Sequence, residues 1–331
     1  MILGENFFEL LNSLPSNVRE IINKIPKDII EKTEEIRLRL NRPLMIDINN
    51  EEKLVSSEGK FVKNIKDSYI ITHEDCNKAL QLISKSSLYA FEEELKNGYI
   101  TLKGGYRVGI VGKCVIENGY IKTMRNISGY NYRIMRELKG VSDNIISYIV
   151  KSPKEVKNTL IISPPQCGKT TLIRDIARNI SNGIDWLGFK GLNIGIIDER
   201  SEISACYNGV PQVDVGIRTD VLDGCPKSSG ILMMIRSMSP KVIITDELGK
   251  QSDIKAIYEA LNAGISVIST IHGKNLQDVL QKHDIKDIIS SNTFDRYIIL
   301  SSKLGAGTVE EILDKDFHTI FKGPKKGGNF T

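Results

Sequence analysis

Cysteine is sparse in this 331-residue chain, and its spacing argues against two classes of stabilised fold. The five cysteines are scattered and never stand in the Cys-x-x-Cys arrangement that zinc sites and redox motifs use. An odd number of unclustered cysteines also argues against a disulfide framework. We therefore expect reduced thiols in a cytoplasmic protein.

Long apolar runs are missing as well. No run approaches the roughly 20 residues that a helix needs to cross a bilayer. The first ten residues, MILGENFFEL, carry acids where a secretory signal would carry a basic head. The sequence therefore predicts a cytoplasmic protein, held at a membrane at most through a partner.

A concentration of basic charge is also absent. The net charge is +4, Lys and Arg are spread along the chain, and aromatic residues make up 6%. Surfaces that follow nucleic-acid phosphates show clustered Lys and Arg, and single-strand channels add stacking aromatics. We therefore do not expect nucleic acid as the main partner, although a patch assembled only by folding stays open.

One stretch has the layout of a phosphate-binding loop. Residues 160–162 are typical of the end of a buried strand, and an apolar-periodic helix begins at Lys169. Gly-Lys-Thr at the junction of strand and helix is the pattern that such a loop requires. The residues expected to bind the nucleotide are Ser163, Pro164, Pro165, Gln166, Cys167, Gly168, Lys169, Thr170 and Thr171.

The chemistry of this loop is local. Unpaired N–H groups at the helix start, together with the helix dipole, favour an anion there. Lys169 would reach the β- and γ-phosphates of ATP, and the Thr170 hydroxyl would ligate Mg²⁺.

The loop departs from the usual pattern at two positions. Ser163 stands where the first glycine is usual, and Gln166 stands where a second glycine is often found. Glycine relieves crowding where the backbone curls around phosphate, so both changes affect the expected loop geometry and affinity. An ordinary strand–turn–helix corner with a solvated lysine is the alternative.

The first part of the chain predicts a smaller α+β domain. Thr72 and Asp75 approximate a capping box, and Asn118-Gly119 between apolar runs predicts a hairpin. The segment 50–68 is polar and is expected to be a loop. Helices are expected at 5–32 (interrupted at Pro15 and Pro26), 73–84 and 86–96, and strands at 35–40, 44–48, 120–122 and 127–135, with glycine-punctuated strands within 99–116.

The second part predicts an α/β domain with a mostly parallel sheet. Apolar strand runs alternate with helical patterns, which favours helices on both faces of the sheet. Strands are expected at 159–162, 192–197, 241–245, 265–270 and 296–300, and helices at 169–180, 227–237, 252–262 and 275–289. We place the domains at 1–140 and 141–310, followed by a tail at 311–331 with a disordered end.

Acidic pairs follow two of these predicted strands. Asp246-Glu247 follows the strand at 241–245, and Asp246 is expected to hold Mg²⁺. Asp198-Glu199 follows the strand at 192–197. Glu199 is the candidate that orients the attacking water and Glu247 is the alternative. The alternative for Asp246-Glu247 is a solvated strand end, and the alternative for Asp198-Glu199 is a salt-bridged loop.

A histidine follows a third strand. His272 is one of four histidines and stands at the end of the strand at 265–270. A lone histidine is usually a hydrogen-bonded residue without a catalytic role. Because functional groups in such sheets collect at the carboxyl ends of the strands, His272 is a candidate sensor of the γ-phosphate.

Four strings now stand in order: SPPQCGKTT, IIDERSEI, VIITDELG and ALNAGISVISTIHG. Together they resemble the Walker A, aspartate, Walker B and histidine boxes of the type II/IV secretion ATPases, the traffic ATPases of secretion and pilus systems. TEEIRLRLNRPL and GGYRVGIVG add to the resemblance, which runs from about Glu34 to about Leu304. Within the family, the resemblance is closest to members that act in sporulation.

The resemblance implies an ATP-hydrolysing enzyme with a RecA-like P-loop NTPase domain after the smaller domain. It also implies a hexameric ring with the nucleotide bound between the two domains. Arginines of the N-terminal domain approach the phosphates in such enzymes, and Arg107, Arg125 and Arg133 are the positions that could serve. By the same resemblance the protein would energise a channel between mother cell and forespore and dock on membrane proteins of a sporulation secretion complex.

Two other functions stay open from the sequence. A nucleic-acid motor would need a continuous basic, aromatic-lined channel. A nucleotide-gated scaffold would bind ATP with little turnover, and the irregular phosphate loop is compatible with that alternative.

Overall fold

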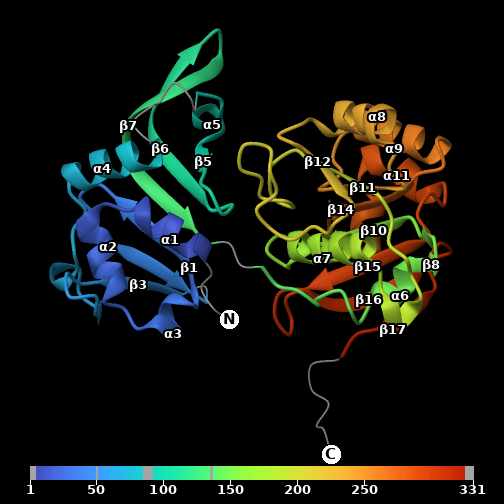
Figure 1. Ribbon diagram of the computed structural model, residues 1–331, viewed down its shortest axis with the longest axis horizontal. Helices are drawn as coiled ribbons and strands as arrows, with labels where there is room; N and C mark the ends of the chain where they lie inside the picture. Colours follow the sequence, from blue (N-terminus) through green and yellow to red (C-terminus); the bar gives the residue numbers. More distant parts are fainter. Residues whose placement is uncertain (1–4, 50, 85–91, 135–136, 325–331) are drawn as a thin grey trace, which may run out of the picture. The chain divides into compact units, whose positions relative to one another are not determined.

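The structure is a computed structural model, and it describes residues 5–49, 51–84, 92–134 and 137–324. The chain divides into two compact units, Met1–Arg136 and Glu137–Thr331 (Figure 1). Each unit has a sheet and a hydrophobic core of its own.

Short helices and an antiparallel sheet build the first unit. The helices are α1 (Glu5–Asn12), α2 (Ser16–Asn23), α3 (Lys27–Ile30), α4 (His73–Ile83) and α5 (Glu92–Asn97), with a 3₁₀ turn at Ile65–Asp67. The strands are β1 (Thr33–Arg39), β2 (Met45–Ile48), β3 (Glu51–Val55), β4 (Phe61–Val62), β5 (Tyr99–Thr101), β6 (Arg107–Glu117) and β7 (Tyr120–Arg133). They lie in the order β4-β3-β2-β1-β7-β6-β5.

Several local expectations are confirmed in this unit. Pro15 and Pro26 are the N-cap residues of α2 and α3, which separates the N-terminal helices as expected. Thr72 and Asp75 form the capping box of α4. Asn118 (φ 52°) and Gly119 (φ 81°) both take left-handed conformations, as the tight turn of the β6–β7 hairpin requires.

Three expectations for this unit were wrong or lie partly outside the described residues. The segment expected as a loop at 50–68 contains β3 and β4 from Glu51 onward, and these two strands pair at the edge of the sheet. β3 lies next to the edge strand β4 and is largely exposed or half-buried, so its polar residues give no clear apolar pattern. The strands expected at 120–122 and 127–135 are one continuous strand, β7. The helix expected at 86–96 is described only from Glu92.

The second unit is an α/β domain. Its helices are α6 (Ile146–Ile149), α7 (Lys169–Asn182), α8 (Lys227–Met238), α9 (Gln251–Asn262), α10 (Leu276–Leu280) and α11 (His283–Ser290), with a 3₁₀ turn at Asp185–Leu187. Its strands are β8 (Val150–Ser152), β9 (Glu155–Val156), β10 (Thr159–Ser163), β11 (Ile194–Asp198), β12 (Thr219–Asp223), β13 (Val242–Thr245), β14 (Ser266–His272), β15 (Arg296–Ser301), β16 (Thr308–Asp314) and β17 (Thr319–Lys322).

The main sheet of this unit is mixed. Its order is β12-β11-β13-β14-β10-β15-β16-β17, and strands β12 to β15 in that order are parallel while β16 and β17 are antiparallel. The five expected strands are confirmed. The strands β12, β16 and β17 were not expected, so the segment from 311 to Lys322 belongs to the sheet rather than to a tail. The helix expected at 275–289 is the pair α10 and α11.

Apolar side chains on both faces fix this sheet between two helical layers. Ile161 and Ile244 pack into the core beneath α7, whereas Ile162 and Ile243 pack into the core beneath α8 and α9. Every residue of β10, β11 and β13 is buried, as expected for parallel strands covered on both sides.

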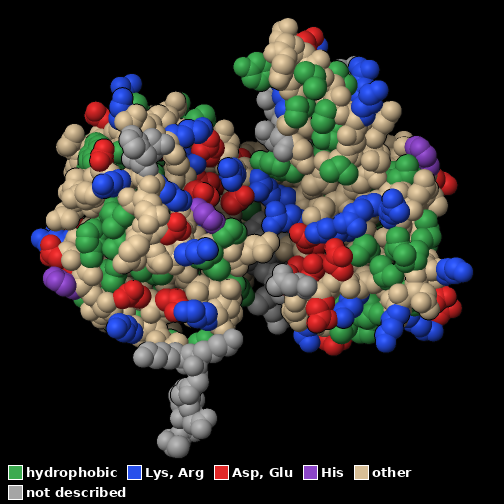
Figure 2. Space-filling view, turned by 180° about the vertical axis from the view of Figure 1, so that it is seen from behind, with side chains coloured by type: hydrophobic (Ala, Val, Ile, Leu, Met, Phe, Trp, Pro, Cys, Tyr) green, Lys and Arg blue, Asp and Glu red, His purple; other side chains and the backbone are tan. Residues whose placement is uncertain are grey.

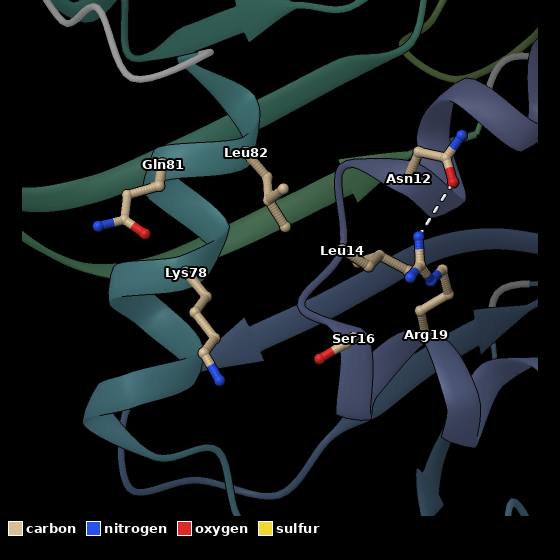
Figure 3. Close-up of a pocket in the computed structure, with 7 residues that line it drawn as sticks. All are labelled: Asn12, Leu14, Ser16, Arg19, Lys78, Gln81 and Leu82. Atoms are coloured by element: carbon tan, nitrogen blue, oxygen red, sulfur yellow. Dashed lines mark hydrogen bonds between the residues drawn. The ribbon is translucent and has the colours of Figure 1, made fainter.

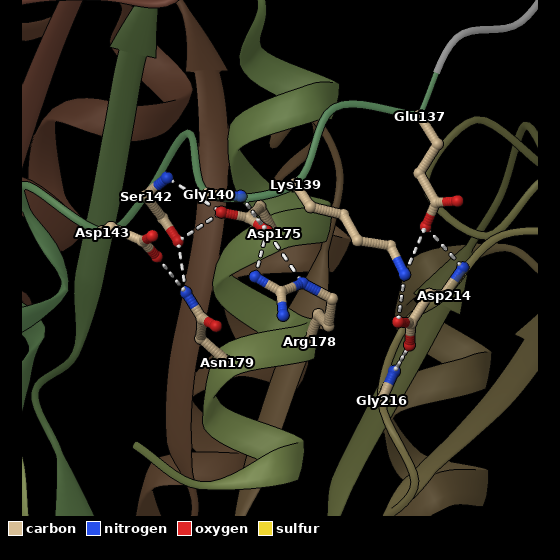
Figure 4. A network of polar contacts seen from close by, with 10 residues as sticks. All are labelled: Glu137, Lys139, Gly140, Ser142, Asp143, Asp175, Arg178, Asn179, Asp214 and Gly216. Atoms are coloured by element: carbon tan, nitrogen blue, oxygen red, sulfur yellow. Dashed lines mark hydrogen bonds and ion pairs between the residues drawn. The ribbon is translucent and has the colours of Figure 1, made fainter. Parts of the chain in front are cut away.

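A polar network ties the start of the second unit to α7 (Figure 4). The buried carboxylate of Asp175 accepts hydrogen bonds from the backbone N–H of Gly140 (3.1 Å) and Ser142 (2.8 Å) and from the Ser142 hydroxyl (2.8 Å). Arg178 adds an ion pair at 2.7 Å. Burial raises the pKa of Asp175, but the bonds from Ser142, Arg178 and Gly140 outweigh burial and hold the pKa below its ordinary value.

Charges of both signs are mixed over the visible surface of each unit (Figure 2). The β6–β7 hairpin, at the top of Figures 1 and 2, exposes the apolar side chains of Val111, Ile116, Tyr120 and Ile121. Within the described ranges, no helix is both long and apolar enough to cross a membrane.

Replacing Asp175 with Asn should lower the free energy of unfolding by about 2 kcal/mol, because donors that now bind a carboxylate would face an amide NH₂. Since the folded pKa lies below the unfolded value of about 4, this stabilisation is complete above the unfolded pKa. It is lost as the pH falls through the folded pKa. Urea unfolding of wild type and variant at several pH values measures the difference.

Asp143→Asn is the matched control, because Asp143 is exposed and accepts one bond, from Asn179 at 3.2 Å. It should change stability by less than about 0.5 kcal/mol. A difference between wild type and Asp175→Asn that stays constant down to pH 2 would contradict the account.

Candidate nucleotide site

The loop between β10 and α7 ends in an uncapped helix start. Gly168 is the N-cap residue of α7 and takes a left-handed conformation (φ 81°). Gly168 has no side chain that could cap the helix, and the first turn of α7 carries no acid. The N-terminal N–H groups of a 14-residue helix therefore keep their affinity for an anion.

The two departures from the usual loop pattern have different consequences. Ser163 is the last residue of β10 and needs no glycine conformation. Gln166 does take a left-handed conformation (φ 57°), which a side chain adopts at a cost of about 1 kcal/mol. The loop thus keeps a backbone form that usually requires glycine, although a glutamine occupies the position.

A second loop supports the phosphate loop. The backbone N–H of Gly307 donates to the carbonyl of Cys167 at 2.9 Å. A Cβ atom on Gly168 would lie 2.8 Å from the Gly307 nitrogen. Gly168 is therefore required twice, by its conformation and by the close approach of this second loop.

Strand register brings the predicted site residues to one edge of the sheet. Ser163 pairs with His272 across β10 and β14, and Thr245 pairs with Ser269 across β13 and β14. Ile197 in turn pairs with Thr245 across β11 and β13. Because these strands are parallel, the phosphate loop, His272 and both acidic pairs leave the sheet side by side.

Asp198 has a structural role at this edge. It is fully buried and accepts the backbone N–H groups of Glu202 and Ser204, both at 2.8 Å. Burial raises the pKa of Asp198 above its ordinary value despite these bonds. Arg174 from α7 donates to the Ile203 and Glu202 carbonyls at 2.5 and 2.7 Å, so the loop after β11 is held from two sides.

A buried lysine joins the next two acids. Lys227, at the start of α8, is 6% exposed and pairs with both Glu199 and Asp246, the latter at 2.9 Å. Burial raises the pKa of Asp246 to about 6, although Lys227 acts in the opposite direction. Burial would raise the pKa of Glu199 too, but its bond to Lys227 holds that pKa below its ordinary value.

Glu247 differs from these two acids. It is exposed, and among the described residues it has neither a hydrogen bond nor an ion pair. Its charge acts on Lys169, whose ammonium donates to the Ser163 carbonyl at 3.3 Å. Burial lowers the pKa of Lys169, and Glu247 partly offsets that effect.

The oxygen donors at this edge fit a magnesium ion. Mg²⁺ prefers hard oxygen ligands, and the Thr170 hydroxyl and the Asp246 carboxylate are such groups. The Thr245 hydroxyl is buried at the end of β13 and has no hydrogen-bond partner in the described part of the chain. The donor chemistry therefore agrees with the metal expected from the sequence.

The three candidate arginines lie in the first unit. Arg107 and Arg133 face each other across β6 and β7. Cζ of the Arg107 guanidinium also lies 4.0 Å from the centre of the Tyr99 ring. Nε of Arg133 lies 3.6 Å from Oε1 of Glu35. Arg125 is exposed farther along the hairpin, opposite Lys113.

A separate pocket of about 350 Å³ lies in the first unit (Figure 3). Its cations are already bonded, since Arg19 donates to Asn12 and Lys78 pairs with Glu74. None of the residues expected from the sequence to act on nucleotide lines it. The lining residues are Asn12, Leu14, Ser16, Arg19, Lys78, Gln81 and Leu82.

Lys227 is not among the site residues expected from the sequence. One signal for it was present, because Lys227 stands at the first position of the helix expected at 227–237. The helix dipole disfavours a cation there, so a lysine at this position points to a partner elsewhere in the fold. Lys282 was also missed; its ammonium donates to the His272 carbonyl.

Comparisons with known proteins agree with this architecture. The profile of the family described as "Sporulation stage III, protein AA" matches residues 5–320. The "Stage III sporulation protein AA" of Bacillus subtilis (strain 168) is 42% identical over 94% of this chain and 96% of its own length. These matches confirm the resemblance to the sporulation members that the motifs indicated.

Two solved structures share the fold. The Legionella pneumophila ATPase DotB superposes with a TM-score of 0.56 at 13% identity, covering 91% of this chain and 80% of DotB. The pilus retraction motor PilT, solved with bound ADP, gives a TM-score of 0.52 at 17% identity, covering 82% and 76% of the two chains. The resemblance to type II/IV secretion ATPases is thus confirmed as a similarity of fold.

Replacing Gly168 with Ala should destabilise the second unit by about 2–3 kcal/mol, because left-handed strain adds to a clash with the Gly307 backbone. Gly264→Ala is the matched control: Gly264 also has a positive φ (74°), but nothing lies within 4 Å of its added Cβ. It should lose only about 1 kcal/mol. Thermal unfolding compares the variants, and equal losses would contradict the close packing of the two loops.

Proposed function

The chain belongs to the sporulation stage III protein AA family, and from that premise we propose that it is an ATPase of the secretion type. It would hydrolyse ATP and use the energy for assembly of, or transport through, a channel between mother cell and forespore. The fold shared with the ATPase DotB and with the pilus retraction motor PilT, which was solved with bound ADP, supports an ATPase.

One observation carries the proposal. The uncapped start of α7 and the polar ends of β11, β13 and β14 meet at a single edge of one sheet. A triphosphate placed at the helix start would have an ammonium, a hydroxyl and several carboxylates within the same edge. In-line attack of water on a γ-phosphate needs such positioning and electrostatics more than covalent chemistry.

We assign a role to each side chain from the polar atoms that it has available for nucleotide, metal or water. Lys169 would bind the β- and γ-phosphates, while Thr170 and Asp246 would hold Mg²⁺. A bound Mg²⁺ would neutralise charge on the phosphate oxygens. His272 would report whether the γ-phosphate is present.

The ion pairs favour Glu247 over Glu199 as the residue that orients the water. Glu199 is engaged by Lys227, whereas Glu247 is exposed and acts electrostatically on Lys169. A carboxylate without a cation partner keeps its acceptor oxygens for a water molecule. This reverses the preference drawn from the sequence, in which Glu199 came first.

The oligomer and the partners follow from the family resemblance. We propose a hexameric ring in which Arg107, Arg125 or Arg133 contributes to a phosphate site. A guanidinium on developing phosphoryl charge is worth several powers of ten in rate, so at least one of these arginines should affect turnover. The ring would dock on membrane proteins of a sporulation secretion complex.

Lys169→Ala should reduce ATP hydrolysis to background, because the ammonium proposed to bind the leaving phosphates is removed. Phosphate release by the purified protein measures the effect. Lys241→Ala is the control, since Lys241 is exposed at the amino end of β13 and should retain wild-type turnover. Wild-type turnover in Lys169→Ala would refute the role of Lys169. Tight ATP binding without turnover in the wild type would favour a nucleotide-gated scaffold.

Glu247→Gln should slow hydrolysis by roughly 10²-fold or more while ATP still binds, because an amide orients water poorly. Glu199→Gln should lower thermal stability by unbalancing Lys227 and should slow turnover less. Single-turnover rates, nucleotide affinity and unfolding temperature separate the two effects. Slow turnover with full stability in Glu199→Gln alone would return the role to Glu199.

A further inference from the structure

Lys227 occupies a position that local physics disfavours. It begins α8 directly after Pro226, where the helix dipole repels a cation. Its side chain is 6% exposed, and a buried ammonium is costly unless it is paired. The two acids must therefore account for its place in the fold.

The contacts of Lys227 cross from one strand end to another. Its ammonium donates to Oε2 of Glu199, after β11, and forms an ion pair with Oδ1 of Asp246, after β13. Each carboxylate thus gives one oxygen to Lys227, and its other oxygen has no hydrogen bond or ion pair within the described residues. The lysine holds the two acids together and cancels much of their combined negative charge.

That charge balance matters for a cation. Two neighbouring carboxylates without a partner attract a divalent ion strongly, and an adjacent ammonium weakens that attraction. A nucleotide brings its own negative phosphates to the same edge and can compensate for the ammonium. The lysine would therefore favour metal that arrives with a nucleotide over metal that arrives alone.

Resting on the proposed nucleotide site, we infer that Lys227 is a positioning residue that makes divalent-cation binding depend on the nucleotide. It competes with the cation for Glu199 and Asp246. Removing its charge exposes an acidic pair that takes the metal without nucleotide.

Mn²⁺ is the probe, and free Mn²⁺ is followed by electron paramagnetic resonance in titrations of the full chain. Without nucleotide, Lys227→Met should bind Mn²⁺ at least roughly tenfold more tightly than the wild type. With a non-hydrolysable ATP analogue present, the two affinities should differ much less. Lys227→Arg, which keeps the charge, should restore the weak binding of the wild type.

Lys250→Met is the matched control, because Lys250 is exposed and acts on Glu199 only at a distance. It should change Mn²⁺ affinity by less than about twofold, since solvent screens its charge. Circular dichroism and thermal unfolding check that each variant is folded. If Lys227→Met does not fold, Mn²⁺ binding is compared between Glu199→Gln and the double variant Glu199→Gln/Lys227→Met. In this pair the Lys227 charge is removed beside Asp246 alone.

Equal Mn²⁺ affinity in the presence and absence of Lys227 overturns the inference. A loss of stability in Lys227→Met without tighter Mn²⁺ binding would also overturn it, because that result indicates a purely structural ion pair. Failure of the wild type to bind the ATP analogue overturns the proposed function instead. The comparison of Mn²⁺ affinities without nucleotide, between the wild type and Lys227→Met, does not depend on that outcome.

Discussion

Parallel strand pairing is the constraint on which the rest of the second unit depends. Apolar side chains cover both faces of β10, β11, β13 and β14, and helices bury both of these faces. Polar groups can leave this sheet only at its ends, and parallel direction sends all of these ends to one edge. The same edge carries the start of α7, where backbone N–H groups attract an anion. Burial of hydrocarbon thus determines where the charged groups gather.

Charge compensation organises that edge. Asp198 is satisfied by backbone N–H groups, whereas Asp246 and Glu199 share one ammonium. Glu247 stays exposed, and Lys169 loses part of its solvation beside the loop. Four carboxylates that look alike in the sequence therefore have different chemistry in the fold. The oxygens that are already bonded therefore determine where an ion can bind among these carboxylates.

The sequence was sufficient for features that local patterns encode. The capping box of α4, the Asn118-Gly119 hairpin and the buried strands of the second unit carry their own signals. It was insufficient for β3, β12 and β16, because half-exposed strands with polar residues lack a clear apolar pattern. The meeting of the strand ends could be predicted, but the ion pairs between their side chains could not. Lys227 pairs with two acids that are distant from it in the chain. The left-handed backbone at Gln166 was also hidden, because only tertiary packing imposes it on a glutamine.

The central claim is that these side chains converge on one triphosphate at the start of α7. A crystal structure with Mg²⁺ and a non-hydrolysable ATP analogue tests it most directly. We expect the phosphates to lie against the N–H groups that follow Gly168, with Lys169 on the outer phosphates and the metal on Thr170 and Asp246. An analogue bound away from the start of α7, with Lys169 facing solvent, would contradict the account.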